Sequence, residues 1–371
     1  MRKKGEGRTA AVFFGGRSNE AEISVITGMY AVNLLRGGKY RILPVFLREE
    51  GGMLTGKWRH VSDFAQPPAG TPVALTEGGL MAGRRRIPLD AALNCCHGGM
   101  GEDGTLAALL AWHRIPSASP AMAESAVFMD KWLTKLTAQG LGVPVLPAFP
   151  VTEEAFSAAP EGVCVQASAF GYPVIVKPAR LGSSIGLTVA HGEEELKGAL
   201  ALAFTLDRLA LVERYHPGRR DVNCAACRLG GEVNISPCEE VFSGGEVLSF
   251  EEKYERGRGS DFPARLPPAA AERIRALTRT LYEAFGMRGA VRADFFVIGE
   301  EVFFNELNIV PGSLASRFFA DSLAGARAFF TALLDEAIAA SVPEKPVLHT
   351  GILSQNIFSG AKGCKRRGNL L

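Results

Sequence analysis

Residues 291–308 read VRADFFVIGEEVFFNELN. Two runs of β-branched and aromatic residues flank a glycine-containing turn, a pattern that predicts a β-hairpin. Because side chains alternate between the two faces of a strand, Arg292 and Asp294 share one face of the first strand. Glu306 and Asn308 share one face of the second strand for the same reason. The hairpin therefore offers four polar side chains whose alignment depends on the strand register.

The length of the turn decides which of these side chains meet. We expect a three-residue turn, 299–301, which places Asp294 directly opposite Glu306. A two-residue turn would place Asp294 opposite Asn305 instead. Opposed carboxylates repel across a sheet, so we expect a cation between them. Two carboxylates and an amide oxygen suit Mg²⁺, which completes its shell with water and phosphate oxygens. The alternatives are a solvated outer face of an edge hairpin, or neutralisation by Arg292 alone.

Length and composition describe an ordinary globular protein. The 371 residues suffice for two or three domains, and 47% of them are hydrophobic. A net charge of +2 gives no reason to expect a nucleic-acid partner. No apolar run is long enough for a transmembrane helix or a signal peptide. We therefore expect a cytoplasmic protein without nucleic-acid or membrane partners.

The seven cysteines show no disulfide or zinc-site spacing. Cys224 and Cys227 match a CxxC pattern, but they lie in an expected strand, where positions three apart point to opposite faces. We therefore expect buried, free thiols that pack as small hydrophobic side chains.

The first part of the chain predicts a doubly wound α/β domain. An apolar run, 9–14, ends at two glycines and precedes a helical pattern over 23–34. A further apolar run, 89–96, ends in a glycine-rich loop that holds His97 and Glu102. Loops at the carboxyl ends of parallel strands commonly carry function. Neither a dinucleotide-binding fingerprint nor a P-loop motif is present.

The middle of the chain predicts a strand, a Gly/Ser-rich loop and a second strand over 171–189. Lys177 lies in the first strand, and the loop spans 182–186. Backbone N–H groups and hydroxyls of such a loop can close over phosphates, with Lys177 supplying charge. An ordinary surface hairpin is the alternative.

Further strands are expected at 209–216, 221–229 and 232–242. Residues 243–262 then lack a clear pattern, which is typical of a lid or binding loop. Helices are expected after Pro267 and over 324–340.

Taken together, the motifs resemble those of the ATP-grasp enzymes, and among them the D-alanine–D-alanine ligase family. The resemblance implies a Rossmann-like N-terminal domain (1–119), followed by a two-part, α+β ATP-grasp fold with a central subdomain (120–212), a C-terminal subdomain (213–345) and a basic tail (346–371). The motifs that carry it are Gly15-Gly16-Arg17-Ser18-Asn19-Glu20, His97-Gly98-Gly99-Met100-Gly101-Glu102-Asp103-Gly104-Thr105, Met129-Asp130-Lys131, Val176-Lys177-Pro178, Gly182-Ser183-Ser184, Glu252-Lys253-Tyr254, Arg292-Ala293-Asp294, Asn305-Glu306-Leu307-Asn308 and Pro311-Gly312.

The resemblance implies that the protein binds ATP and two Mg²⁺ ions, with Mn²⁺ able to replace Mg²⁺. Asp294, Glu306 and Asn308 would be the metal ligands. The segment from Glu213 to His216 would line the adenine pocket through its backbone. Residues matched to nucleotide contacts are Lys131, Lys177, Gly182, Ser184, Glu213, Tyr215, His216, Asp221 and Lys253. Asp221 stands one residue out of register with the family's ribose-binding carboxylate, because Arg220 intervenes.

The implied reaction converts the carboxylate of D-alanine into an acyl phosphate, which the amine of a second D-alanine attacks. The product would serve peptidoglycan precursor synthesis, and the family is typically homodimeric. The residues matched to catalytic roles are Glu20, Ser183, Tyr254, Arg292 and Gly312. Those matched to substrate binding are His97, Glu102 and Ser313.

The chain departs from the family pattern at Ile309 and at residues 313–315. In the family this segment helps to bind the carboxylate of the second substrate. Ser313, Ser316 or Arg317 are the candidates for replacement contacts, so the second substrate is the least determined feature.

Three other functions are compatible with parts of this pattern. A variant ligase would join D-alanine to D-serine or D-lactate, although Tyr254 in the lid favours an amine acceptor. A catalytically silent ATP-binding sensor would not need the metal ligands, which are intact. An ATP-grasp ligase for an unrelated acid would not need the His97 loop.

Overall fold

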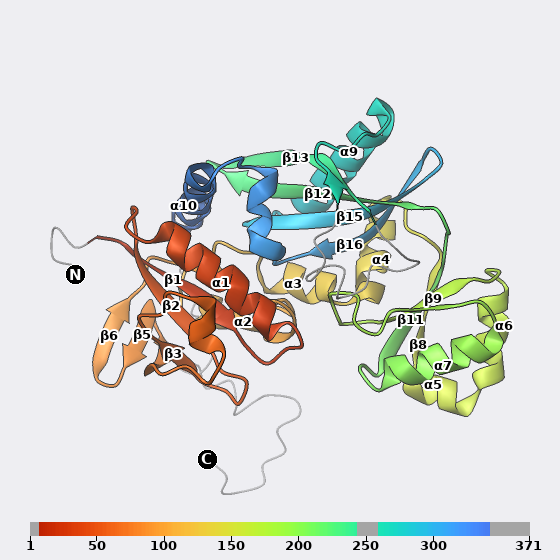
Figure 1. Ribbon diagram of the computed structural model, residues 1–371, viewed down its shortest axis with the longest axis horizontal. Coiled ribbons are helices and arrows are strands. Elements are labelled where there is room, and N and C mark those ends of the chain that lie inside the picture. The colour runs from red at the N-terminus through yellow and green to blue at the C-terminus, as the bar shows by residue number, and fades with distance from the viewer. Residues whose placement is uncertain (1–6, 243–258, 342–371) are drawn as a thin grey trace, which may run out of the picture. The chain divides into compact units, whose positions relative to one another are not determined.

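The computed structural model describes residues 7–242 and 259–341, and Figure 1 shows their elements. Lys253, Tyr254 and the basic tail lie outside the described residues. Within the described part of the chain, no helix is long and apolar enough to cross a membrane.

The N-terminal sheet has the strand order β6-β5-β4-β3-β2-β1-β7, in which only β2, β1 and β7 run parallel. The other four strands pair in antiparallel orientation, so residues 50–88 form short hairpins. The strands are β1 (Thr9–Gly15), β2 (Arg41–Leu47), β3 (Met53–Thr55), β4 (Thr71–Thr76), β5 (Gly79–Ala82), β6 (Arg85–Pro88) and β7 (Ala91–Asn94).

Helices cover both faces of this sheet at β1. Val12 and Phe14 lie in the core cluster that contains Met29 of α1 (Ala21–Leu35). Phe13, on the other face, clusters with Leu106 of α2 (Thr105–Trp112). Because helices cover both faces, the short apolar run is buried on both sides. The loop that follows the carboxyl end of β1 lies where such sheets commonly bind ligands.

Two short helices, α3 (Met122–Met129) and α4 (Lys131–Gly140), lead into the second sheet. Asp130 separates them, because its carboxylate caps α4 by accepting hydrogen bonds from the backbone N–H groups of Trp132 and Leu133. The sheet is antiparallel, with the order β10-β9-β11-β8. Its strands are β8 (Ala148–Thr152), β9 (Val174–Pro178), β10 (Thr188–Ala190) and β11 (Leu209–Arg214).

One face of the second sheet packs against helices α5 (Glu153–Ala158), α6 (Pro160–Ser168) and α7 (Glu193–Phe204), as Figure 1 shows. Val176 and Val212 point into that core. Their neighbours Lys177 and Glu213 consequently point away from the helices, toward the opposite face.

The third sheet has the order β14-β13-β12-β15-β16 and is antiparallel throughout. Its strands are β12 (Arg220–Leu229), β13 (Glu232–Val241), β14 (Ser260–Asp261), β15 (Ala290–Ile298) and β16 (Glu301–Asn308). Helix α9 (Pro268–Ala284) covers one face, where Val222 and Cys224 cluster with Ile274. The other face carries the polar side chains. The remaining elements are α10 (Leu323–Ala339) and the 3-10 helices Val61–Phe64, Gly99–Gly101 and Gly312–Phe318.

The hairpin has the expected pairing of Asp294 with Glu306, but its turn is shorter than predicted. The three-residue turn was wrong, because Ile298 pairs with Glu301 and the turn has only two residues. A β-bulge at Asn305 inserts one extra residue into β16 and restores the register, so that Asp294 still pairs with Glu306. Bulges of this kind re-aim side chains next to functional sites. Here Asn305 and Glu306, which are neighbours in sequence, line the same cavity.

The six cysteines of the described residues are free and buried, as expected from their spacing. Cys224 and Cys227 belong to the apolar core of the third sheet.

Candidate active site

A cavity of about 390 Å³ lies between the helix-free face of the second sheet and the polar face of the third. Loops of the N-terminal domain complete its wall. Its size suits a small-molecule ligand. The predicted site residues that line it are Glu20, His97, Glu102, Lys131, Lys177, Gly182, Ser183, Ser184, Asp221, Arg292, Asp294, Glu306, Asn308 and Gly312. Among the described residues, the predicted Glu213, Tyr215, His216 and Ser313 do not line it.

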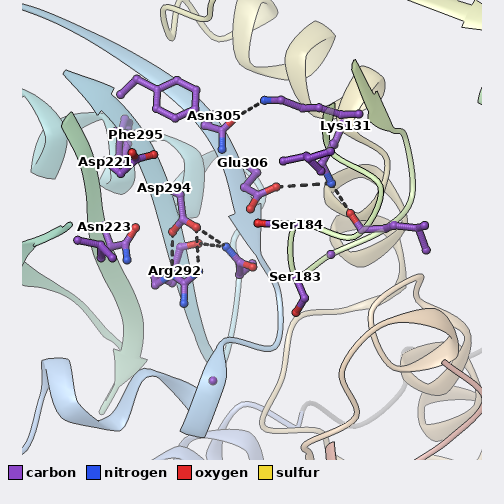
Figure 2. Close-up of a pocket in the computed structure, with 18 of the residues that line it drawn as sticks. Lys131, Ser183, Ser184, Asp221, Asn223, Arg292, Asp294, Phe295, Asn305 and Glu306 are labelled. Atoms are coloured by element: carbon purple, nitrogen blue, oxygen red, sulfur yellow. Dashed lines mark hydrogen bonds and ion pairs between the residues drawn. The ribbon is translucent and has the colours of Figure 1, made fainter. Parts of the chain in front are cut away.

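A row of polar side chains crosses the third sheet at the floor of the cavity. Asp294 pairs with Glu306 on one side and with Asn223 of β12 on the other, and Asn223 pairs with Glu239 of β13. Figure 2 shows Asn223, Asp294 and Glu306 side by side. Sequence reasoning missed Asn223, Glu239 and the bulged Asn305, because only the order of the strands brings them next to Asp294.

Asp294 has a positively charged partner in this structure. Nε and Nη2 of Arg292 donate to its two carboxylate oxygens at 2.7 and 2.8 Å, and the amide nitrogen of Asn308 donates to Oδ2 at 3.0 Å. Burial opposes the charge of Arg292, but Asp294, then Glu306 and Glu239, raise its pKa above the ordinary value. Arg292 therefore stays charged and neutralises Asp294.

Across the hairpin, Glu306 faces Lys131, whose Nζ lies 3.6 Å from Oε2 (Figure 2). Nζ of Lys131 also donates to the carbonyl oxygen of Leu181. This lysine begins α4, so the helix start, the Gly/Ser-rich loop and the hairpin meet at one ammonium group.

The donor set fits a hard divalent cation. Asp294 and its paired residue Glu306 present carboxylate oxygens, and Asn308, two residues along β16, presents an amide oxygen. Such oxygen ligands are the ones Mg²⁺ prefers. Two opposed carboxylates also require positive charge nearby, which Arg292 and Lys131 supply here.

A buried cluster of three charges supports Lys177. Nζ of Lys177 lies 2.7 Å from Oε1 of Glu213 and 3.1 Å from Oδ1 of Asn305. Nζ of Lys135 lies 2.5 Å from Oε2 of the same Glu213. All three charged side chains are at most 5% exposed. The family resemblance implied a backbone contact of Glu213 in the adenine pocket, and its side chain has a separate role in holding two lysines.

The cluster carries one more positive than negative charge. Burial would raise the pKa of Glu213, but Lys135 and Lys177 lower it to about 2. Burial, and repulsion from Lys135, lower the pKa of Lys177. An anion that entered the cavity beside Lys177 would relieve this imbalance, so the cluster favours binding of a phosphate group.

The Gly/Ser-rich loop contacts the start of α1. The hydroxyl of Ser183 donates to Oε1 of Glu20. A Cβ atom on Gly182 would lie 2.7 Å from Oε2 of Glu20, so a larger residue here would displace the Glu20 carboxylate. Ser183 and Ser184 adopt positive φ angles of 51° and 60°, a strained conformation that is common at functional sites.

His97 and Glu102 are buried at the carboxyl end of β7. Nε2 of His97 lies 2.8 Å from the hydroxyl of Thr27. Burial, and the charge of Arg292, lower the pKa of His97 to about 4. The carboxylate of Glu102 accepts hydrogen bonds from the backbone N–H groups of Gly98 and Val310. Burial and the neighbouring Glu20 raise the pKa of Glu102 to about 8.

We expect protonation of His97 to destabilise the protein in weak acid. Its pKa is lower in the folded than in the unfolded state, so the unfolded state binds more protons between pH 6.5 and 4, and this contribution to stability falls as the pH falls. From pH 7 to pH 5, the native protein should lose about 2 kcal/mol more than the His97→Gln variant. Urea unfolding of both proteins at the two pH values measures this difference. Both proteins keep Glu102, so its opposing contribution cancels. Equal losses would contradict a buried neutral imidazole.

The segment 312–318 follows β16 and closes one end of the cavity. Ser313, Leu314 and Ala315 adopt left-handed φ angles of 48°, 50° and 53°. Ala315 and Phe318 pack on Ala225, on the cavity face of β12, which holds this strained turn in place. Among the replacement candidates, Arg317 lines the cavity, whereas Ser316 is buried and Ser313 lies outside the lining.

The side chains of Arg220 and Asp221 point to opposite faces of β12, because side chains alternate along a strand. Arg220 forms a two-point ion pair with Glu240, with both distances at 2.6 Å, and Asp221 lines the cavity. The carboxylate at this end of β12 therefore faces the cavity despite its shift in register.

Comparisons in sequence agree with these features. The family description "D-ala D-ala ligase N-terminus" matches residues 9–120, and "D-ala D-ala ligase C-terminus" matches residues 137–339. A D-alanine–D-alanine ligase from Wolinella succinogenes is 37% identical over 328 residues, which cover 84% of this chain and 89% of that protein. One from Helicobacter pylori (strain Shi470) is 34% identical and covers 90% of this chain and 94% of that protein.

Solved structures are similar over the same length. The D-alanine–D-alanine ligase from Helicobacter pylori has a TM-score of 0.74 and 32% identity, covering 91% of this chain and 100% of that one. The VanG D-Ala:D-Ser ligase from Enterococcus faecalis has a TM-score of 0.75 and 26% identity with the same coverage. The fold is thus a mixed α/β architecture with an N-terminal domain and ATP-grasp-like C-terminal sheets. The chain belongs to the D-alanine–D-alanine ligase family.

Proposed function

We propose that the protein is an ATP-dependent ligase that joins two D-alanine molecules into D-alanyl-D-alanine for peptidoglycan synthesis in the cytoplasm. The observation that carries the proposal is the cavity in which Asp294 and Glu306 lie close to Lys131 and Lys177. This combination offers ligands for a divalent cation together with cations for phosphate oxygens. Family membership supplies the identity of the amino acid.

The nucleotide phosphates would bind at the lysine side of the cavity. Lys131 and Lys177 would contact phosphate oxygens, and the Gly182–Ser184 turn would close over them with its backbone N–H groups. Asp294, Glu306 and Asn308 would hold the metal, as two Mg²⁺ ions or as Mn²⁺. When bound, the metal would neutralise charge that develops on the transferred phosphoryl group. Asp221 would contact the ribose, with Tyr215 and His216 near the adenine.

The reaction proceeds in two steps. A carboxylate is a poor electrophile, so the first D-alanine is activated by transfer of the γ-phosphoryl group of ATP to its carboxylate. The amine of the second D-alanine then attacks the acyl carbon, and phosphate leaves. Arg292 and the N–H of Gly312 would donate to the developing oxyanion, at about 3 kcal/mol per donor in comparable sites.

Residues of the N-terminal domain would orient the first substrate. Glu20, held by Ser183, would bind its ammonium group, with His97 and Glu102 nearby. Lys253 and Tyr254 would act from the lid, by contacting phosphate and by joining Ser183, and their roles rest on the family resemblance. Exclusion of water by the closed lid would protect the acyl phosphate from hydrolysis.

The finer division of the chain belongs to the same proposal. Residues 1–119 would form a Rossmann-like domain, and residues 120–212 and 213–345 the two ATP-grasp subdomains. The separate sheets β8–β11 and β12–β16 support the second boundary. A homodimer is the assembly we expect from the family.

ADP release by the purified protein with ATP, Mg²⁺ and D-alanine tests the function. Parallel reactions add D-serine or D-lactate, and mass spectrometry resolves the products. We expect D-alanyl-D-alanine with D-alanine alone. Turnover only with a mixed pair would reassign the second substrate, and ATP binding without turnover would support a silent sensor instead.

A further inference from the structure

The segment 312–318 places one guanidinium group apart from the other cations of the cavity. The cations among the described lining residues are Lys131, Lys177, Arg219, Arg292 and Arg317. The side chains of the first four are 12%, 5%, 12% and 24% exposed. That of Arg317 is 62% exposed. A guanidinium group that lines a cavity and remains accessible is suited to bind an incoming anion.

Each of the other four cations already has a place in the proposed site. Lys131 and Lys177 face the phosphate side, and Arg292 is held by two contacts to Asp294. Arg219 stacks at 4.7 Å on the rings of Tyr215 and Phe296, where the adenine is expected. Among the described lining residues, this leaves Arg317 as the cation that the proposed function has not yet assigned. Arg317 follows Gly312 by five residues in the same segment, next to the expected site of amine attack.

Arg317 is anchored by a carboxylate that the sequence did not single out. Its Nη2 donates to Oε2 of Glu239, a side chain that is 0% exposed. The second oxygen, Oε1, is buried and has no hydrogen-bond partner among the described residues. A buried carboxylate with one unused acceptor can take a second N–H of the same guanidinium group, and such two-point pairing fixes the plane of the arginine.

Both Glu239 and Arg317 are held in place by the surrounding fold. Glu239 continues the polar row of Asn223 and Asp294, so its position is set by the register of β13. Phe318 packs on Ala225, and the guanidinium carbon of Arg317 lies 5.1 Å from the ring of Phe318. Strand register and packing of the strained turn therefore bring Glu239 and Arg317 together, although 78 positions separate them in sequence.

We propose that Arg317 binds the carboxylate of the second D-amino acid and that Glu239 is the positioning residue that orients its guanidinium group. This inference rests on the proposed function and names the recognition element of its second subsite. It explains how the chain can depart from the family pattern at residues 313–315 and still hold a carboxylate. Arginine supplies up to five donors, so the pair with Glu239 leaves others free for the substrate.

Steady-state kinetics with ATP, a fixed saturating concentration of the first substrate and a varied second substrate test the assignment. We expect Arg317→Ala to raise the KM of the second D-alanine about tenfold to a hundredfold, with a much smaller change in kcat, because one charge-assisted contact is lost. Glu239→Gln should raise the same KM about threefold to tenfold. The KM of ATP should not change in either variant. The matched control is Glu232→Gln, an exposed residue on the same strand, which should behave as the native protein.

Two further comparisons separate positioning from a structural role. In the Arg317→Ala background, Glu239→Gln should have no further effect on the KM of the second substrate, because Glu239 acts on that KM through Arg317. D-alaninamide, which lacks the carboxylate, should be a poor second substrate for the native protein, and the discrimination should disappear in Arg317→Ala. Thermal melting of each variant identifies loss of fold, and Arg317→Lys serves as a second variant at the largely exposed position.

An unchanged second-substrate KM in Arg317→Ala and Arg317→Lys would overturn the assignment. Additive effects in the double variant would overturn the role of Glu239. Both results are measured on a protein that still forms D-alanyl-D-alanine. Absence of any dipeptide from the native protein is a different outcome, which would reject the proposed function and the inference with it.

Discussion

Replacing Asp294 with asparagine is expected to lower kcat for ADP release by about a thousandfold. The change keeps the size of the side chain and removes the charge, so the cavity loses a metal ligand and Arg292 loses both of its ionic contacts. A metal that neutralises a transferring phosphoryl group contributes several kcal/mol, and each 1.36 kcal/mol is tenfold in rate. Steady-state assays over a range of Mg²⁺ concentrations would show the loss and whether excess metal restores any of it.

The control for this variant lies on the same hairpin. Glu301→Gln makes the same carboxylate-to-amide change on β16, at an exposed position outside the cavity. It should keep the native rate. A variant at Asp294 that retained the native fold, judged by near-UV circular dichroism, and kept more than a tenth of the native kcat would argue against metal binding at this row.

Replacing Glu213 with glutamine is expected to produce the largest loss of stability. The variant leaves the ammonium groups of Lys135 and Lys177 buried without their shared counter-ion. Removing one partner of a buried ion pair typically destabilises a protein by about 3–5 kcal/mol, because the remaining charge is uncompensated. We expect a loss of about this size here. Urea unfolding at pH 7 measures the change, with the exposed Glu232→Gln variant as the control for an amide substitution on a strand.

The same cluster gives a dependence on pH that supports this result. The pKa of Glu213 is lowered to about 2 in the folded state, so its contribution is fully present above the unfolded value, near 4.5, and disappears as the pH falls toward 2. The stability difference between the native protein and Glu213→Gln should shrink over this range. A difference below about 1 kcal/mol at pH 7 would mean that water, or a shift in protonation of the lysines, already compensates the buried charges.

The hairpin shows which features of the site could be predicted from local sequence pattern. Alternation along a strand is a property of the backbone itself, and it was enough to put Arg292 with Asp294 and Glu306 with Asn308. The opposition of Asp294 and Glu306 was also predicted, but from a turn length that the structure contradicts. The bulge at Asn305 supplied the missing residue, and no short-range rule places a bulge at this position.

The side-chain contacts of Glu213 are a second feature that the sequence did not predict. The family resemblance implied a backbone contact between this residue and the nucleotide. Its side chain contacts Lys177 from a neighbouring strand and Lys135 from α4, and the sequence pattern did not indicate these two contacts. Neither lysine is close to Glu213 in sequence, so only the folded chain brings the three charges together.

The motifs in the sequence indicated the family and, through the resemblance, most of the residues that line the cavity. The strands and helices that flank each motif could be predicted because turns, glycines and side-chain alternation are local. Tertiary structure decided which motifs touch one another. Glu239 became a partner of Arg317, and Asn223 a neighbour of Asp294, only through the order β13-β12-β15-β16. Pairing between strands that are distant in the chain depends on the free energy of the whole sheet and its covering helices, and no segment carries that information alone.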